Sequence, residues 1–242
     1  MTILMTIAGR GSRFASEGYS LPKPLIPVNG LPMVVQAVKC LPTADKYVFV
    51  CNRQHCEDFE LDTILTNTFE NVEIVTIDEV TEGQAVTAQI GIEHSSIAPD
   101  DDILISSCDY GLRYDLDKYD SIDSDIIVWA TTNNKAFASN PSAYSWLELH
   151  ENKIANTYVK TAYYNDPFNE HAIVGTFYFR KSKHFLDLVR EMYDRDIRSN
   201  GEYYIDNIFT WQPDRLVPDA SIFTVEEYIC WGTPKDLENY EN

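Results

Sequence analysis

The sequence predicts an α/β fold in which a mostly parallel central sheet is flanked by helices. Short apolar runs rich in β-branched residues, at 2–7, 46–51 and Val72–Ile77, alternate with segments whose apolar residues recur at helical spacing. Such alternation favours parallel strands joined by right-handed crossovers. A glycine-rich loop follows the first run directly, which is where open α/β sheets bind ligands.

The first half of the chain supplies these elements in order. We expect strands at residues 2–7, 46–51, Val72–Ile77 and 102–107, and a further central strand at 124–132. We expect helices at residues 31–41, in a poorly defined region at 53–69, and from Gly83 to about Glu93.

The second half changes in character. Residues 144–149 and 153–159 alternate polar and apolar side chains and are expected to form strands, as are residues 171–179 and 222–229. Residues 181–195 form an amphipathic helix, and residues 201–207 open another helix. No repeat or linker divides the chain, so we expect a single domain over residues 1–242, with a change of role near residue 132.

The composition indicates a folded globular protein with an acidic surface. The 242 residues are 44% hydrophobic and carry a net charge of −19, which argues against nucleic acid or an anionic membrane as a partner. The five cysteines are scattered, which favours reduced thiols over a disulfide framework or a zinc site. Because no segment resembles a membrane span or a signal peptide, we expect a cytoplasmic protein.

The loop at residues 8–14, Ala-Gly-Arg-Gly-Ser-Arg-Phe, is expected to bind a polyphosphate. Gly9 and Gly11 can take positive φ and bring backbone N–H groups close to phosphate oxygens, while Arg13 and Lys23 add positive charge. A Walker A loop would need Gly-Lys-Ser/Thr, and a dinucleotide fingerprint would need a small residue in place of Phe14. Neither of these motifs fits.

Together with Pro-Lys-Pro-Leu at residues 22–25, the loop resembles the signature of the sugar-phosphate nucleotidyltransferase family. The similarity is close over residues 8–28 and weaker over most of the remaining chain. It implies a Rossmann-like, GT-A-like fold with Mg²⁺ as cofactor. Residues 1–132 would then bind the nucleotide and residues 133–242 the acceptor.

The resemblance implies catalytic roles for Arg13 and Lys23. It also implies that the loop holds phosphates and that the turn after the third strand reads the base through the Gly83 backbone and the Gln84 side-chain amide. The nucleotide-binding candidates are Ala8, Gly9, Arg10, Gly11, Ser12, Gly83 and Gln84.

Metal binding is expected at Asp109, which follows the fourth strand and matches the family's metal-binding aspartate, because Mg²⁺ prefers carboxylate and phosphate oxygens. Many relatives have a second aspartate where this chain has Cys230, and a thiol is a poor partner for Mg²⁺. Either Glu226 or Glu227 replaces it, with Glu227 as our candidate, or Asp109 acts with phosphate oxygens and water.

For the acceptor, Lys160 matches the lysine that grips the acceptor phosphate in many relatives, although a solvated lysine is an equal alternative. Glu202 and Asp206 are spaced i, i+4 in an expected helix and suit sugar hydroxyls, with an exposed acidic face as the alternative. The acceptor-binding candidates are Lys160, Glu170, Gly175 and Glu202.

The implied reaction is attack of a sugar 1-phosphate on the α-phosphorus of a nucleoside triphosphate, with release of pyrophosphate. The product would be a nucleotide-activated sugar for surface polysaccharide synthesis. Both substrates are small molecules, and a homo-oligomer is left open.

Three alternatives stand beside this reaction. The first is CTP-dependent transfer to phosphocholine, a polyol phosphate or another phosphomonoester, with an ammonium cage built from Tyr144, Trp146, Tyr163, Tyr164 and Phe168. The second is a nucleotide-sugar-dependent glycosyltransferase. Such an enzyme is expected to carry an Asp-x-Asp metal motif at the fourth strand, but Asp109 is followed by Tyr110 and Gly111. The third is an inactive nucleotide-binding regulator.

Overall fold

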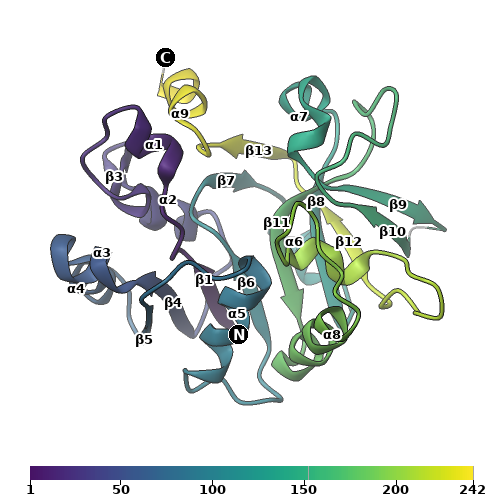
Figure 1. Cartoon of the computed structure of the whole chain (residues 1–242), viewed down its shortest axis with the longest axis horizontal. Helices are drawn as coiled ribbons and strands as arrows, with labels where there is room; N and C mark the ends of the chain where they lie inside the picture. The colour runs from purple at the N-terminus through teal and green to yellow at the C-terminus, as the bar shows by residue number, and fades with distance from the viewer. Residues whose placement is uncertain (152, 242) are drawn as a thin grey trace.

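The computed structural model describes residues 1–151 and 153–241, and among these nine strands form one mixed sheet (Figure 1). The strands are β1 (Thr2–Thr6), β4 (Lys46–Asn52), β5 (Val72–Ile77), β6 (Ile103–Ser106), β8 (Ile126–Thr131), β9 (Trp146–His150), β10 (Lys153–Tyr158), β11 (Ala172–Phe179) and β12 (Ser221–Thr224). Their order is β10-β9-β11-β6-β1-β4-β5, with β8 paired to both β11 and β12.

The parallel part of the sheet comes from the first half of the chain. Strand β1 pairs in parallel with β4 and β6, and β4 pairs in parallel with β5. Strand β11 is antiparallel to β6, β8 and β9, so it joins the later strands to the parallel part. The predicted α/β class, with a mostly parallel sheet between helices, is confirmed.

Helices cover both faces of the sheet. Helix α2 (Met33–Lys39) and helix α4 (Leu61–Thr68) pack on one face, and α5 (Gln84–Glu93) and α8 (Ser182–Asp194) pack on the other. Successive residues of β1 point to opposite faces, so Ile3 lies in the first apolar cluster and Leu4 in the second. A strand buried on both faces reads as a continuous apolar run, which is why β1 is evident in the sequence.

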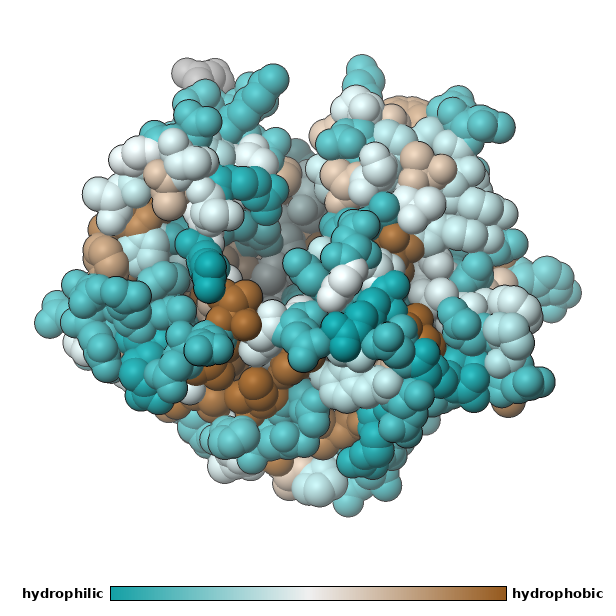
Figure 2. Space-filling view, in the orientation of Figure 1, coloured by the Kyte–Doolittle hydropathy of each residue, from teal (hydrophilic) through white to brown (hydrophobic). Residues whose placement is uncertain are grey.

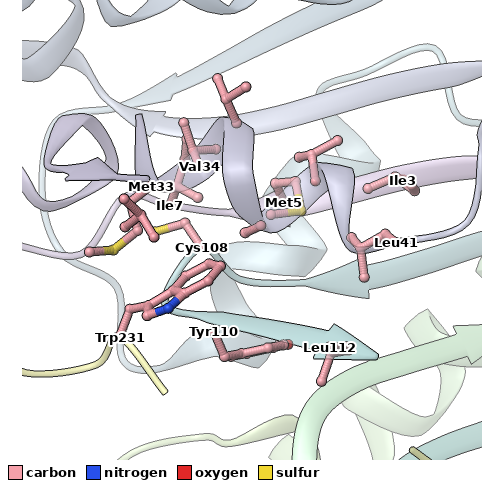
Figure 3. Packing of buried hydrophobic residues seen from close by; sticks show 14 of the residues in the cluster. Ile3, Met5, Ile7, Met33, Val34, Leu41, Cys108, Tyr110, Leu112 and Trp231 are labelled. Carbon is pink, nitrogen blue, oxygen red and sulfur yellow. The ribbon is translucent and has the colours of Figure 1, made fainter. Parts of the chain in front are cut away.

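A second, two-stranded sheet carries the end of the chain back to the centre. Strand β13 (Glu227–Cys230) pairs antiparallel with β7 (Tyr110–Arg113). Trp231 then packs among Met33, Cys108 and Tyr110 (Figure 3). Its backbone N–H donates to the Asp109 carbonyl oxygen at 2.8 Å. Residues 230–232 therefore lie directly beside the segment that follows β6.

Two predictions about elements were wrong. Residues 222–229 form two strands, because the Val225 N–H donates to Ala130 in the large sheet and the Glu226 N–H donates to Arg113 in the small one. Residues 201–207 do not open an α-helix: a 3₁₀ helix, η3 (Ile205–Phe209), begins after Glu202. Glu202 and Asp206 therefore do not share a helical face.

Several short elements were not predicted or differ in extent. Glu60, with φ of 53°, divides the helical region at 53–69 into two helices. The remaining elements are α1 (Ser12–Ser16), η1 (Lys23–Leu25), β2 (Pro27–Val28), β3 (Leu31–Pro32), α3 (Arg53–Phe59), α6 (Leu116–Asp120), α7 (Lys135–Ser139), η2 (Pro141–Ala143) and α9 (Pro234–Glu241). In the part of the chain that the structure describes, no helix has the length and apolarity of a membrane span.

Gly83 gives a test of how α5 is anchored. It has φ of 143°, and a Cβ atom there would lie 2.4 Å from the Tyr203 carbonyl oxygen. We expect Gly83→Ala to lower the free energy of unfolding by about 2–4 kcal/mol, from backbone strain plus steric overlap. The control Gly30→Ala has φ of 79° with open space around it, and should cost only about 1 kcal/mol. Urea denaturation measures both, and equal losses would contradict the proposed contact.

Candidate active site

A cavity of about 860 Å³ opens at the carboxyl ends of β1 and β6. Figure 2 shows it as a hollow at the upper edge of the view, between the part that carries α1 and α9 and the part that carries α7. Three acidic and four cationic side chains line it, and these are Asp109, Asp206, Asp236, Arg13, Lys23, Lys160 and Lys235. The cavity is thus a locally positive region of a protein whose net charge is −19.

Parallel register brings the two central segments of the cavity together. Met5 of β1 lies opposite Ser106 of β6, so the glycine loop and the Ser107–Asp109 segment leave the sheet at the same edge. The sequence separates these segments by about a hundred residues, but the sheet places them side by side.

Gly11 allows Lys23 to approach the loop. Its φ is 61°, and a Cβ atom on it would lie 2.9 Å from the Lys23 Cβ atom. Lys23 begins the 3₁₀ helix η1, in which the Leu25 N–H donates to Pro22 and the Ile26 N–H donates to Lys23. The glycine spacing and the Pro-Lys-Pro-Leu turn therefore position one lysine.

Lys23 and Asp109 form an ion pair on the wall of the cavity. The Lys23 Nζ atom lies 2.8 Å from Asp109 Oδ2, and the Ser107 hydroxyl donates to Asp109 Oδ1 at 2.7 Å. Burial alone would raise the pKa of Asp109, but Lys23 outweighs burial and lowers that pKa to about 2. Asp109 in turn raises the pKa of Lys23 against its own burial, so both groups are charged at neutral pH.

A second carboxylate lies across Gly232 from Asp109. The position of a Cβ atom on Gly232 would be 3.6 Å from Asp109 Oδ2 and 3.9 Å from Asp236 Oδ2. Asp236 accepts a hydrogen bond from the Thr233 hydroxyl at the start of α9. Cys230 is on the same side, but burial raises the pKa of its thiol to about 11, so it remains a neutral thiol.

Asp109 and Asp236 fit a magnesium ion that would also be bound by phosphate oxygens of a substrate. Mg²⁺ takes one or two carboxylates and completes its shell with water and phosphate oxygens, which matches Asp109 with Asp236 nearby. Within residues 1–151 and 153–241, no group of three or more His, Cys, Asp or Glu side chains could hold a metal ion.

Glu227, the predicted second metal ligand, does not lie in the cavity. Along β13 its side chain is on the opposite side from those of Tyr228 and Cys230, which line the cavity. It forms an ion pair with Arg113 at 3.2 Å and is half exposed. The prediction is therefore corrected, because strand alternation turns Glu227 away from Asp109.

The far end of the cavity is formed by the second half of the chain. The Lys160 Nζ atom donates to the Ala143 carbonyl oxygen at 2.6 Å and lies 5.5 Å from the ring centre of Tyr204 and 6.0 Å from that of Tyr144. Gly175 in β11 and Asp206 in η3 complete this end.

The structure brings most of the predicted residues together. Those that line the cavity are Gly9, Gly11, Ser12, Arg13, Lys23, Gln84, Asp109, Lys160 and Gly175. Those outside its lining are Ala8, Arg10, Gly83, Glu170, Glu202 and Glu227.

The predicted site residues that do not line the cavity have other neighbours. Ala8 is buried in the core, and Gly83 packs against the Tyr203 backbone. Arg10 is exposed, and Glu170 lies at a separate small cleft beside Phe168. Glu202 precedes η3, where its carboxylate lies against the Tyr204 hydroxyl and, with burial, raises that hydroxyl's pKa to about 12.

The aromatic residues considered as an ammonium cage do not form one. The Trp146 indole N–H donates to the Pro141 carbonyl oxygen, Tyr163 stacks on Tyr158, and the Tyr164 hydroxyl donates to the Leu147 carbonyl oxygen. Of the five, only Tyr144 lines the main cavity.

Sequence reasoning missed Asp236 and Ser145 as cavity residues. Thr233-x-x-Asp236 is a helix N-terminal pattern, and its recognition would have predicted α9. Nothing in the pattern shows that this helix start faces Asp109, since that depends on the pairing of β13 with β7.

A cavity with this excess of cationic side chains suits phosphorylated substrates. The chain belongs to the MobA-like NTP transferase domain family, which matches residues 3–150, and it is a nucleotidyltransferase. Among curated proteins, no significant match is found.

Solved structures share the fold. The nucleoside-diphosphate-sugar pyrophosphorylase from Vibrio cholerae RC9 has 18% sequence identity and a TM-score of 0.76, with 99% of each chain covered. The inositol-1-phosphate CTP transferase from T. maritima has 14% identity and a TM-score of 0.72, covering 99% of this chain and 93% of that one. The predicted resemblance to sugar-phosphate nucleotidyltransferases is confirmed.

The ion pair makes a prediction about pH. In Lys23→Met the lysine no longer opposes the burial of Asp109, while Ser107 and Arg13 still lower its pKa, so the pKa of Asp109 should rise from its wild-type value of about 2. Because the Asp109 carboxyl has a pKa of about 2 in the folded protein and 3.8 in the unfolded chain, its ionised form stabilises the fold above pH 3.8. This contribution is lost as the pH falls toward 2. The variant should therefore lose stability relative to wild type at pH 7, and the loss should be smaller at pH 3, where part of this stabilisation has already gone.

Carboxyl ¹³C titration and urea denaturation at both pH values measure these effects. Lys235→Met, which removes an exposed lysine from the same cavity, is the control. An unchanged Asp109 pKa in Lys23→Met would refute the proposed balance between burial and charge.

Proposed function

We propose that the protein transfers a nucleoside monophosphate from a nucleoside triphosphate to a sugar 1-phosphate and releases pyrophosphate. The observation that carries this proposal is a cavity lined by an excess of cationic side chains, which runs from the glycine loop, past Lys23 and Asp109, to Lys160. It offers room and charge for two phosphorylated molecules end to end. The product is a nucleotide-activated sugar, the class of donor used in polysaccharide synthesis.

The nucleotide end rests on Arg13 and the glycine loop. Arg13 lines the cavity and makes no ion pair with any residue in the described ranges, so its charge is available to the β and γ phosphates. The backbone of Gly9 and Gly11 lies beside it. Gln84 donates to the Thr6 hydroxyl at 3.1 Å, which orients its amide oxygen for a base.

The reacting phosphates meet beside Lys23. The acceptor phosphate is already anionic at pH 7, so the protein needs to align two anions and offset the charge that develops, without a general base. Asp109 and Gly11 hold Lys23 in position before substrate binds. Substrate binding therefore requires a smaller loss of side-chain conformational entropy at Lys23. Mg²⁺ held by Asp109, with Asp236 as the nearby second carboxylate, would supply charge neutralisation at the phosphates.

The rival reactions find less support. A glycosyltransferase would want a second acid close after Asp109, but the next residues are Tyr110, which is buried and bonded to Ser106 and Thr176, and Gly111. An inactive regulator would have no need of an oriented lysine. Transfer to another phosphomonoester remains a second candidate, supported by the likeness to an inositol-1-phosphate CTP transferase.

Pyrophosphate release tests the reaction class. Each common nucleoside triphosphate is incubated with Mg²⁺ and a panel of sugar phosphates and alcohol phosphates. We expect pyrophosphate only when both substrates are present. Hydrolysis without an acceptor, or no pyrophosphate with any pair, would contradict the proposal.

The roles of Arg13 and Lys23 can be tested by substitution. Arg13→Ala and Lys23→Ala should each lower kcat/KM by about 10²-fold or more, as for loss of one transition-state donor. Arg10→Ala is the matched control, because Arg10 belongs to the same loop but lies outside the cavity. Steady-state kinetics measure the effect, with circular dichroism to verify folding. Near-wild-type turnover in the first two variants would remove them from the mechanism.

The neutral thiol beside Asp109 gives a further prediction. Cys230→Asp places a carboxylate close to Asp109 and should tighten Mg²⁺ binding by roughly tenfold or more. Calorimetric titration of Mg²⁺ in the presence of a non-hydrolysable nucleotide measures this, and Cys230→Asn controls for the change in size. Equal Mg²⁺ affinities in all three proteins would place the metal elsewhere.

A further inference from the structure

A buried carboxylate lies at the end of the cavity near Lys160. Asp206 is only 8% exposed, yet it lines the cavity. Among the described residues its carboxylate forms no ion pair within 4.0 Å. Burial raises the pKa of Asp206, against the effect of Lys160, Ser145 and its own backbone amide. A buried carboxylate calls for hydrogen-bond donors, and here a ligand can supply them.

Ser145 adds a second polar group with unused capacity. Its hydroxyl is buried in the same cavity and has no hydrogen bond of normal geometry within residues 1–151 and 153–241, although it is close enough to Asp206 to lower that pKa. Its position is fixed, because the Ile173 N–H donates to the Ser145 carbonyl oxygen at 2.8 Å. Two elements distant in sequence therefore present one acceptor and one hydroxyl to the same space.

The nearby aromatic faces are already used by a cation. Lys160 Nζ lies 5.5 Å from the Tyr204 ring centre and 6.0 Å from that of Tyr144. A quaternary ammonium ligand would have to share these rings with the lysine ammonium. A quaternary ammonium group also has no N–H or O–H, so it could offset the charge of Asp206 but could neither donate a hydrogen bond to its carboxylate nor accept one from the Ser145 hydroxyl.

We propose that Asp206 and Ser145 bind hydroxyl groups of the acceptor, so that the acceptor is a sugar phosphate or polyol phosphate in preference to phosphocholine. This inference rests on the proposed function, because it concerns the second substrate of that reaction. A hydroxyl can donate to the Asp206 carboxylate and accept from the Ser145 hydroxyl at the same time. Lys160, in the same end of the cavity, remains available for the acceptor phosphate.

Binding measurements separate this inference from the reaction itself. α-D-Glucose 1-phosphate, myo-inositol 1-phosphate and phosphocholine are titrated calorimetrically into the protein with a non-hydrolysable nucleoside triphosphate and Mg²⁺. We expect at least one of the two hydroxylated phosphates to bind roughly tenfold or more tightly than phosphocholine, as for a buried polar site left unpaired by the wrong ligand. Equal or tighter binding of phosphocholine, or binding of none of the three, overturns the proposal.

Substitution then assigns the selectivity to Asp206. Asp206→Asn keeps the shape but removes the charge, and should weaken binding of the hydroxylated phosphate about tenfold to a hundredfold while leaving nucleotide affinity within about twofold. Deoxy analogues of that ligand supply the check, since an analogue that lacks the contacted hydroxyl should lose affinity in wild type but much less in the variant. Asp194→Asn, on the exposed surface of α8, is the matched control.

Ser145→Ala covers the case in which Asp206→Asn fails to fold, and should weaken the same ligand without affecting the nucleotide. Unchanged affinity in the folded variants overturns the proposal. If a hydroxylated phosphate binds in an Asp206-dependent way but pyrophosphate never forms, the proposed reaction fails and the assignment of this subsite stands.

Discussion

The ion pair between Lys23 and Asp109 is the interaction on which the cavity depends. It links residues 86 positions apart in sequence, at 2.8 Å, across the edge of the parallel sheet. Three neighbours support it: Gly11 admits Lys23, the Ser107 hydroxyl orients Asp109, and the Trp231 N–H holds the Asp109 carbonyl. Because the pair is well shielded, each charge stabilises the other, and a lysine is presented to the cavity in a defined position before any ligand arrives.

The second constraint is charge. A protein with a net charge of −19 repels phosphates in general, so binding two of them requires cations that are not neutralised by local acids. Lys23 is paired with Asp109, but Arg13 lines the cavity, and neither Arg13 nor Lys160 has an ion-pair partner within 4.0 Å in the described part of the chain. An excess of cationic side chains therefore lines this cavity in a protein that is acidic as a whole.

The two halves of the cavity differ in how they are built. The end that we propose for the nucleotide is formed by loops at the ends of parallel strands, which their register brings to a common edge. The end that we propose for the acceptor is formed by antiparallel strands and by the 3₁₀ helix η3, and it carries the buried polar groups Ser145 and Asp206. Strand β11 pairs with both β6 and β8 and so holds the two ends in one sheet. In the reaction we propose, the nucleotide and the acceptor therefore bind to different parts of the same fold.

The sequence by itself determined the α/β class and the glycine loop at the end of β1. Continuous apolar runs mark strands that are buried on both faces, and Gly11 and Lys23 are local requirements of one turn. Only the tertiary structure decided which acids face the cavity. The break between β12 and β13 and the alternation of β13 turn Glu227 outward, and the same pairing brings Asp236 beside Asp109. The start of η3 after Glu202 separates it from Asp206. These outcomes depend on pairing between segments far apart in the chain, which local periodicity does not record.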